Sequence, residues 1–106
     1  EIWETGFGKK VLFMPRTEPL PEDGSMGMGR YIEDLGLKDE VVAMVYPDRR
    51  GEGYGMSRFN DDKRMEFTKV GEEDDVHFAH NKGFIAKTSA SGVGRLKELL
   101  EMVWVG

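Results

Sequence analysis

The sequence predicts an α+β domain with a mixed β-sheet and helices packed on it. Short runs of β-branched and aromatic residues, bounded by glycine, proline, asparagine or aspartate, recur along the chain. Two further segments carry apolar residues at helical spacing. The order of strands, helix, strands and helix is typical of α+β folds. The 106 residues contain no internal repeat and no linker, so we expect one domain over residues 1–106 with a single core.

The first predicted element is a β-hairpin. Residues 1–5 and the apolar run within 10–16, which Pro15 ends, have strand composition, and Gly6 and Gly8 favour a turn between them. Residues 17–24 contain two prolines among acidic side chains and predict a loop.

A short helix is expected next. Ser25 is suited to be its N-cap, because a serine hydroxyl accepts a hydrogen bond from an unpaired amide of the first turn. Met28, Ile32 and Leu35 follow at helical spacing, and Gly36 is a typical residue at which a helix ends.

A second hairpin is predicted around the centre of the chain. Residues 40–46 are a continuous β-branched run, as in a strand buried on both faces in the middle of a sheet. Residues 47–53 have turn composition, and residues 54–60 return as a strand. Alternation divides the side chains of this returning strand between two faces: Tyr54, Met56 and Arg58 on one, and Gly55, Ser57 and Phe59 on the other.

The last third of the chain predicts three strands and a helix. Residues 64–70 alternate as a strand does, and residues 71–75 form an acidic loop. Residues 76–88 predict strand, turn and strand, with His80 through Gly83 displayed at the turn. A closing helix has an apolar stripe made of Val93, Leu96, Leu99, Leu100 and Val103.

Composition limits the possible partners and location. The formal charge of −5 argues against a broadly basic face that coats duplex DNA. There is no cysteine, no apolar run near the roughly 18 residues that a membrane helix needs, and no signal peptide pattern. We therefore expect a cytoplasmic protein with no membrane partner. Because the chain begins at Glu1 in a strand-like segment, we also expect it to be part of a longer protein.

Metal binding by the histidines is one alternative. His77 and His80 follow Asp74 and Asp75 closely. An odd offset on a strand sends two side chains to opposite faces, which prevents joint ligation unless the backbone bends. The run of four acidic residues at 72–75 is more typical of a solvated surface than of a magnesium or manganese site.

Phosphate recognition rests on a different set of residues. The chain has no nucleophile elbow, phosphate-loop lysine signature or zinc-protease helix. Glycines at 24–29 favour entry into a helix, with a phosphate at the helix N-terminus as the lesser alternative. Arg58 on a strand and Lys82, Gly83 and Lys87 around a turn combine positive charge with a glycine that lets a ligand approach the backbone. Basic residues on strands also serve solubility and protect sheet edges.

The order of motifs resembles the C-terminal, DHH-associated domain of the DHH phosphoesterase superfamily. The motifs that carry this resemblance are the strand at 8–13, Met-Gly-Arg-Tyr-Ile-Glu-Asp-Leu at 28–35, Val-Val-Ala-Met-Val-Tyr-Pro at 41–47, Tyr-Gly-Met-Ser-Arg at 54–58 and Leu-Lys-Glu-Leu-Leu at 96–100. His-Asn-Lys-Gly-Phe-Ile at 80–85 is similar to the His-x-x-Gly-Phe-Ile segment of MYG-type hydrolases, which are relatives of the DHH enzymes.

The resemblance implies a substrate-binding role beside a catalytic domain. In that family the metals, usually Mn²⁺ with Mg²⁺ as the alternative, lie in an N-terminal domain that carries Asp-His-His. The associated domain helps to hold the phosphate ester or nucleotide. His80, Gly83 and Lys82 would stand at the substrate-gripping turn, and Ser57 and Arg58 on the family's Ser and Arg strand. The Asp-His-His motif is absent from this sequence, so the chain alone should hydrolyse nothing and needs no cofactor of its own.

This chain departs from the family pattern in two places. A Gly-Gly-Gly-His segment is replaced by His-Phe-Ala-His at 77–80, which removes a backbone cradle for phosphate. The family strand often reads Ser-x-Arg-Ser, whereas this chain has Ser57 followed directly by Arg58. A slip of one residue would turn the arginine to the other face of the sheet.

The expected function is to hold a phosphate ester, nucleotide or short single-stranded nucleic acid next to metals bound by the N-terminal catalytic domain of the same protein. Ser57, Arg58, His80, Gly83 and the lysines Lys82 and Lys87 are the expected substrate-binding residues. The alternative is a non-catalytic protein-interaction module of α+β fold. Its seven methionines, which include Met26 and Met28, would suit an adaptable contact surface. A third possibility is a self-sufficient metal enzyme that uses the histidines and the acidic run.

Overall fold

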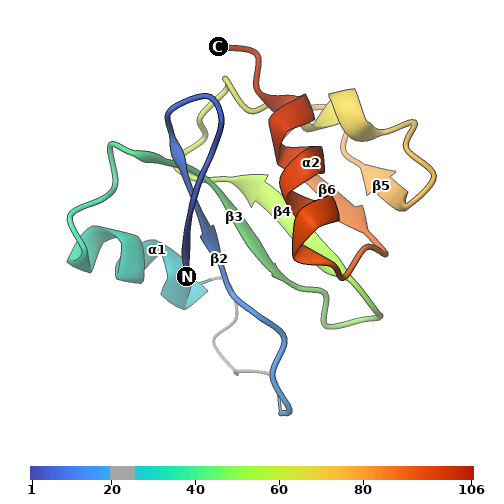
Figure 1. The fold of residues 1–106 in the computed structure, drawn as a ribbon, viewed down its shortest axis with the longest axis horizontal. Helices are drawn as coiled ribbons and strands as arrows, with labels where there is room; N and C mark the ends of the chain where they lie inside the picture. The colour runs from blue at the N-terminus through green and yellow to red at the C-terminus, as the bar shows by residue number, and fades with distance from the viewer. Residues whose placement is uncertain (20–25) are drawn as a thin grey trace.

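The described residues form a six-stranded mixed sheet in the strand order β1-β2-β3-β4-β6-β5. The structure is a computed structural model, and it describes residues 1–19 and 26–106. Two helices, α1 and α2, and the short 3₁₀ helix η1 accompany the sheet, so the predicted α+β class is confirmed (Figure 1). The elements in chain order are β1 (Ile2–Glu4), β2 (Lys10–Phe13), α1 (Met26–Asp34), β3 (Val41–Pro47), β4 (Tyr54–Arg58), η1 (Phe67–Val70), β5 (Val76–Ala79), β6 (Ile85–Thr88) and α2 (Val93–Val103).

The two predicted hairpins are present in the sheet, and a parallel pair of strands joins them. β1 and β2 pair antiparallel across the glycine turn, and so do β3 and β4. β2 and β3 are parallel, which requires a crossover, and α1 lies in that connection. β6 pairs with β4 on one side and with β5 on the other, both antiparallel. The predicted strand, turn and strand of residues 76–88 are therefore confirmed.

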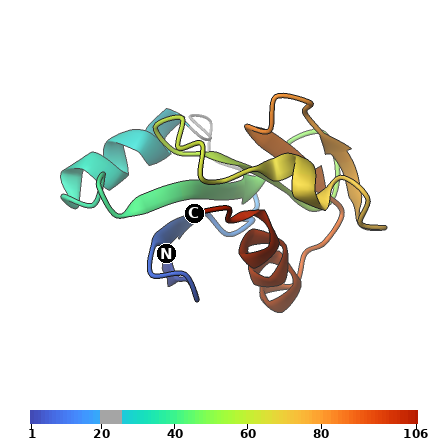
Figure 2. The ribbon, with the colours of Figure 1, turned by 90° about the horizontal axis from the view of Figure 1, so that it is seen from above.

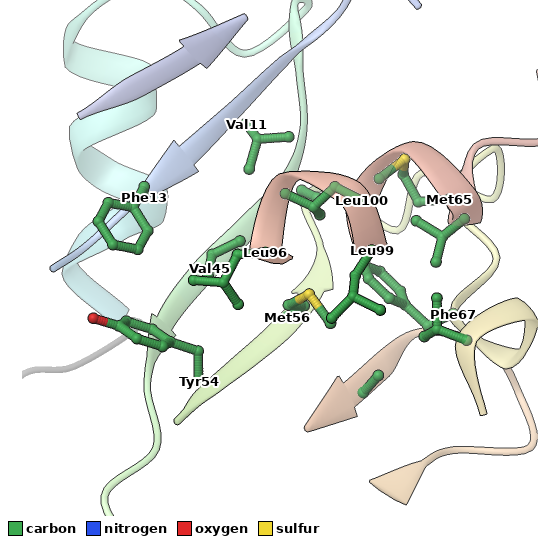
Figure 3. Close-up of a cluster of buried hydrophobic side chains, with 14 of the residues drawn as sticks. Val11, Phe13, Val45, Tyr54, Met56, Met65, Phe67, Leu96, Leu99 and Leu100 are labelled. Carbon is green, nitrogen blue, oxygen red and sulfur yellow. The ribbon is translucent and has the colours of Figure 1, made fainter. Parts of the chain in front are cut away.

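Helix α2 covers one face of the sheet and forms the larger part of the core. Leu96, Leu99 and Leu100 of this helix pack toward Val45 and Met56 on the central strands (Figure 3). Full burial of one such side chain contributes about 1.5–3 kcal/mol. This side of the sheet therefore supplies most of the hydrophobic stabilisation.

Helix α1 lies on the opposite side of β3 (Figure 2). It buries Met28 and Ile32 against Leu12 and Val41 in a smaller second cluster. The helix ends as predicted, because Gly36 just beyond it adopts a φ of 70°. The expected N-cap Ser25, the loop residues from 20 onward and the side chain of Met26 lie outside the described part of the chain.

The strand predicted at residues 64–70 is wrong. Only Met65 makes a strand-like bridge, to Trp104, and η1 follows from Phe67 to Val70. The Glu66 side chain accepts hydrogen bonds from the amide and the hydroxyl of Thr68, which closes a turn at this point. The buried Phe67 and Val70 are three residues apart, which matches the repeat of a 3₁₀ helix better than the two-residue repeat of a strand.

Three smaller predictions also need correction. The β4 strand ends at Arg58 rather than at residue 60, because Asn60 and Asp61 adopt φ values of 57° and 51° that turn the chain. The strand predicted from residue 10 up to Pro15 ends at Phe13, since Met14 and Pro15 continue as irregular backbone. Val93 is 44% exposed in the first turn of α2, whereas the other four members of its predicted stripe are buried. Neither described helix is long and apolar enough to cross a membrane.

Candidate functional site

One end of the sheet has a face that no described helix covers. Antiparallel pairing places Ser57 of β4 opposite Ile85 of β6, and the amide of His80 donates to the Ile85 carbonyl at 3.0 Å. In the next row, Gly55 of β4 lies opposite Lys87, and Lys87 lies opposite Phe78 of β5. Paired residues share a face. We call the surface made by these residues and the adjoining turn the open face; its members are Ser57, Phe78, His80, Phe84, Ile85 and Lys87.

The open face lies opposite α2. Tyr54 and Met56 alternate with its β4 residues, as the sequence predicted, and the structure places both in the core beneath α2. Helix α1 packs against the β1-β2-β3 end of the same side, so neither helix of residues 1–19 and 26–106 covers the β4-β6-β5 end. Phe78 and Phe84 are 44% and 40% exposed, which is high for large apolar side chains.

The histidine of the open face is held in one tautomer. His80 follows β5 directly, and its Nδ1 accepts a hydrogen bond from the Lys82 amide at 3.0 Å. A neutral imidazole whose Nδ1 accepts must carry its hydrogen on Nε2. The ring lies 4.4 Å from the Phe84 ring and 6.2 Å from the Phe78 ring, measured between centroids. His80 therefore offers an oriented N–H donor between two aromatic rings.

The tight turn from His80 to Phe84 depends on Gly83. Its φ is 78°, and its amide donates to the His80 carbonyl at 2.9 Å. Its carbonyl accepts from the amide of Phe67 at 3.0 Å, so both backbone groups are used within the protein. A Cβ at this position would overlap the Glu66 carboxylate. The sequence predicted that a ligand comes close to the backbone at Gly83. In the structure, the carboxylate of Glu66 lies close to Gly83 instead.

Arg58 lies on the other face of the sheet. Its side chain is only 8% exposed, and its Nε donates to the Met65 carbonyl at 2.7 Å. Its guanidinium also pairs with Glu66 at 3.4 Å and with Asp61 at 3.7 Å. The hydrogen bond from Thr68, with a smaller contribution from the Arg58 charge, holds the pKa of Glu66 below its usual value. Arg58 and His80 thus do not converge on one ligand position in this structure.

Ser57 and the two lysines are on or beside the open face. Lys87 projects between Gly55 and Phe78, and Lys82 is exposed in the turn. Ser57 lies near the phenol of Tyr46. Burial raises the pKa of this phenol, and the interaction with Ser57 offsets part of that rise. Five of the six residues expected to bind substrate, namely Ser57, His80, Lys82, Gly83 and Lys87, are therefore grouped on the open face or in its turn, and Arg58 lies on the opposite face.

The aromatic members of the open face were not among the residues predicted to bind substrate. Phe78 is two residues before His80, so the alternation of a strand already placed both on one face. For Phe84, the signal in the sequence is the His-x-x-Gly-Phe-Ile motif at 80–85. Tyr46 belongs to the same side, and its ring lies where a side chain on Gly55 would stand.

The acidic residues near His77 are engaged in a structural ion-pair cluster. Arg95 of α2 bonds both carboxylate oxygens of Asp75 at 2.8 and 2.9 Å, and also bonds Glu73 at 2.9 Å. A register shift falls between Val76 and Phe78, at the position of His77. Within residues 1–19 and 26–106, no three histidine, aspartate or glutamate side chains come together as metal ligands.

Comparisons with protein-family models, with curated proteins and with solved structures found no match to this chain. The resemblance to the DHH-associated domain therefore rests on the motifs alone.

Proposed function

We propose that the open face binds the phosphate of a nucleotide or phosphate ester, and that this chain is a substrate-binding domain of a DHH-type phosphoesterase. The observation that carries the proposal is the hydrogen bond that the Lys82 amide donates to Nδ1 of His80. This bond leaves the hydrogen of the neutral ring on Nε2, on a face that also carries Lys87 and Ser57. An oriented donor beside a positive charge is the arrangement that recognises phosphate oxygens.

The proposal assigns a separate task to each side chain. His80 donates a hydrogen bond from Nε2, Ser57 supplies a hydroxyl, and Lys82 and Lys87 neutralise charge. Fixing these groups before the ligand arrives reduces the cost of orienting them at the moment of binding. Arg58 contributes by holding Glu66 beneath the turn; direct contact between Arg58 and phosphate would require it to leave Met65 and Glu66.

The chemistry of hydrolysis would come from a catalytic domain of the same protein. Mn²⁺ or Mg²⁺ bound by Asp-His-His in that domain would activate the attacking water, while this domain positions the ester. The gene tests this part directly. An Asp-His-His segment encoded upstream in the same frame supports the proposal, and an initiator codon directly before the Glu1 codon contradicts it.

Phosphate binding by the chain itself is tested by calorimetric titration with a nucleoside monophosphate and with inorganic pyrophosphate. Low ionic strength is needed, because salt screens contacts to exposed lysines. His80→Ala and Lys87→Gln should each weaken binding several-fold. Lys38→Gln, which changes an exposed lysine beyond α1, serves as the control and should bind as the wild type does. Equal affinity in all four proteins would remove the site assignment.

A further inference from the structure

Glu66 lies beneath the turn that presents His80. A Cβ on Gly83 would overlap the Glu66 carboxylate, so this carboxylate is in contact with the backbone of the turn. The Glu66 side chain is 33% exposed, and both of its oxygens have partners: Thr68 donates to Oε2 at 2.6 Å, and the Arg58 guanidinium donates to Oε1 at 3.4 Å. A negative charge therefore lies at the base of the turn at which phosphate is proposed to bind.

A charge at this place affects the binding of an anion. Like charges repel, and the repulsion is stronger beside a protein surface than in bulk water. The cation that offsets Glu66 is Arg58, whose side chain is only 8% exposed and whose Nε donates to the Met65 carbonyl at 2.7 Å. Arg58 also lies 3.7 Å from Asp61, but Asp61 is 71% exposed, so water largely screens its charge. The charge of Glu66 is therefore balanced chiefly by Arg58.

Backbone hydrogen bonds fix this pair to the turn. The Arg58 amide donates to the Phe84 carbonyl, and the Phe67 amide donates to the Gly83 carbonyl, each at 3.0 Å. Phe67 directly follows Glu66 in the chain. The charges of Arg58 and Glu66 consequently keep a set position relative to the turn.

We infer that Arg58 and Glu66 are positioning residues of the phosphate site: Glu66 supports the turn, and Arg58 cancels the charge of Glu66 so that the turn can accept an anion. The inference rests on the proposed function and deepens it, because it names two residues that set the affinity without touching the ligand. A direct contact between Arg58 and phosphate would make Arg58 necessary whatever residue stands at position 66. A balancing role makes Arg58 necessary only while Glu66 is charged.

The test is a calorimetric titration with inorganic pyrophosphate at low ionic strength. Glu66→Gln keeps the shape of the side chain and an oxygen that accepts from Thr68, but it removes the charge. This variant should bind pyrophosphate about three- to tenfold more tightly than the wild type, because Arg58 is then unbalanced, and the gain should shrink as salt is added. Damage to the turn alone would weaken binding instead.

Arg58→Met removes the opposite charge and leaves Glu66 unbalanced. It should bind pyrophosphate about three- to tenfold more weakly than the wild type, whereas Arg58→Lys keeps the charge and should retain most of the affinity. The double variant Arg58→Met, Glu66→Gln should return to the wild-type affinity. Glu33→Gln, which removes the same charge from an exposed position on α1, is the control and should bind as the wild type does. Circular dichroism shows which variants fold, and Glu66→Gln decides the question even if Arg58→Met does not.

The supporting role of Glu66 has a readout that needs no ligand. The ¹⁵N signals of the His80 ring report which nitrogen carries the hydrogen. The wild type and Glu66→Gln should show it on Nε2, because the Lys82 amide donates to Nδ1. Glu66→Ala removes the group beneath Gly83 and should show a mixture of the two tautomers. An unchanged Nε2 tautomer in Glu66→Ala would overturn the supporting role.

The titrations separate this inference from the proposed function. If Glu66→Gln binds pyrophosphate no more tightly than the wild type, Arg58 does not act by balancing Glu66, and the inference is wrong while the phosphate site stands. If the double variant binds as weakly as Arg58→Met, Arg58 contacts the ligand directly and the inference is also wrong. If the wild type binds no pyrophosphate, the proposed function fails and the inference fails with it.

Discussion

The two faces of strands β4 and β6 differ sharply although the same short segments build both. On the α2 side, Met56 and Ala86 are fully buried in a core that includes the leucines of the helix. On the other side, Ser57 and Lys87 are only partly buried, and two phenylalanines stand exposed beside a histidine. The period of two along a strand allows one face to provide stability while the other remains available for a ligand.

This division predicts that stability and binding respond to different residues. Changes on the α2 side should lower the free energy of unfolding, and changes on the open face should alter binding with little effect on folding. The turn at Gly83 and the Arg95 cluster lie between these extremes, because they hold the open-face strands in place.

The largest effect is expected from the core. Leu99→Ala removes a fully buried side chain, and the free energy of unfolding should fall by about 2.7–5 kcal/mol from lost burial and the cavity left behind. Leu35→Ala is the matched control, because Leu35 is 46% exposed, and its effect should stay within about 0.5 kcal/mol. Urea denaturation measures both. Similar losses in the two variants would contradict the claim that burial beneath α2 supplies most of the stability.

The next largest loss of stability is expected in the turn from His80 to Phe84. Gly83→Ala forces an alanine to a φ of 78° and pushes its Cβ into the Glu66 carboxylate. Gly36→Ala meets a similar φ of 70° with no atom in its way, so it should lose only the conformational cost of about 1–2 kcal/mol.

The difference between these two variants isolates the overlap with Glu66. Gly83→Ala should be clearly less stable than Gly36→Ala in urea denaturation, and the double variant Glu66→Ala, Gly83→Ala should recover part of that difference. No recovery in the double variant would mean that Glu66 does not set the space beneath the turn.

A smaller and pH-dependent effect is expected at the Arg95 cluster. The hydrogen bond from Arg95 holds the pKa of Asp75 below its ordinary 3.8. A depressed folded-state pKa contributes stability above the ordinary value, and this contribution is lost as the pH falls through the lowered value. Asp75→Asn should therefore lower the Tm at pH 7 by at most about 4 °C, because the pair is partly exposed.

The gap between wild type and Asp75→Asn should close as the pH falls below 3.8. Asp74→Asn, at the exposed neighbouring position, is the control and should follow the wild type at every pH. Thermal melts between pH 7 and pH 2.5 measure both variants. A gap that stays constant with pH would show that the Asp75 charge is not what stabilises this region.

The smallest effect on stability is expected on the open face. Lys87→Gln and Phe84→Leu should change the free energy of unfolding by no more than about 0.5 kcal/mol, because neither residue is part of a buried cluster. Lys87→Gln is nevertheless expected to weaken ligand binding several-fold. Strong destabilisation by either one, measured in urea, would mean that the open face is needed for folding.

Much of the fold could be predicted because local patterns and tertiary packing agree. Residues 40–46 are β-branched and apolar, and they form the central strand β3 almost within the expected bounds. The strand predicted at 64–70 is wrong for a local reason. Met65 and Phe67 are two residues apart, as in a strand, whereas Phe67 and Val70 are three apart, as in a 3₁₀ helix. The hydrogen bond that the Glu66 side chain accepts from Thr68 stabilises the 3₁₀ turn. Capping of this kind leaves little trace in hydrophobic periodicity.

The site was harder to predict than the fold. Alternation along β4 correctly predicted that Ser57 and Arg58 lie on opposite faces. The family pattern nevertheless predicted that Arg58 and His80 bind the same ligand. The partner of Arg58, Glu66, comes from a segment misread as a strand, so the ion pair could not be foreseen. The aromatic flank of His80 required knowledge of which face α1 leaves uncovered.

The central claim is that the open face, and not the α2 face, meets a phosphate-bearing ligand. The most direct measurement is an NMR titration of the ¹⁵N-labelled chain with a dinucleotide at low salt. The account predicts shifts of amide signals at Ser57, at Phe78 and across the turn from His80 to Lys87, while Leu96, Leu99 and Leu100 stay unchanged. Shifts confined to α2, or none anywhere at millimolar ligand, would contradict it.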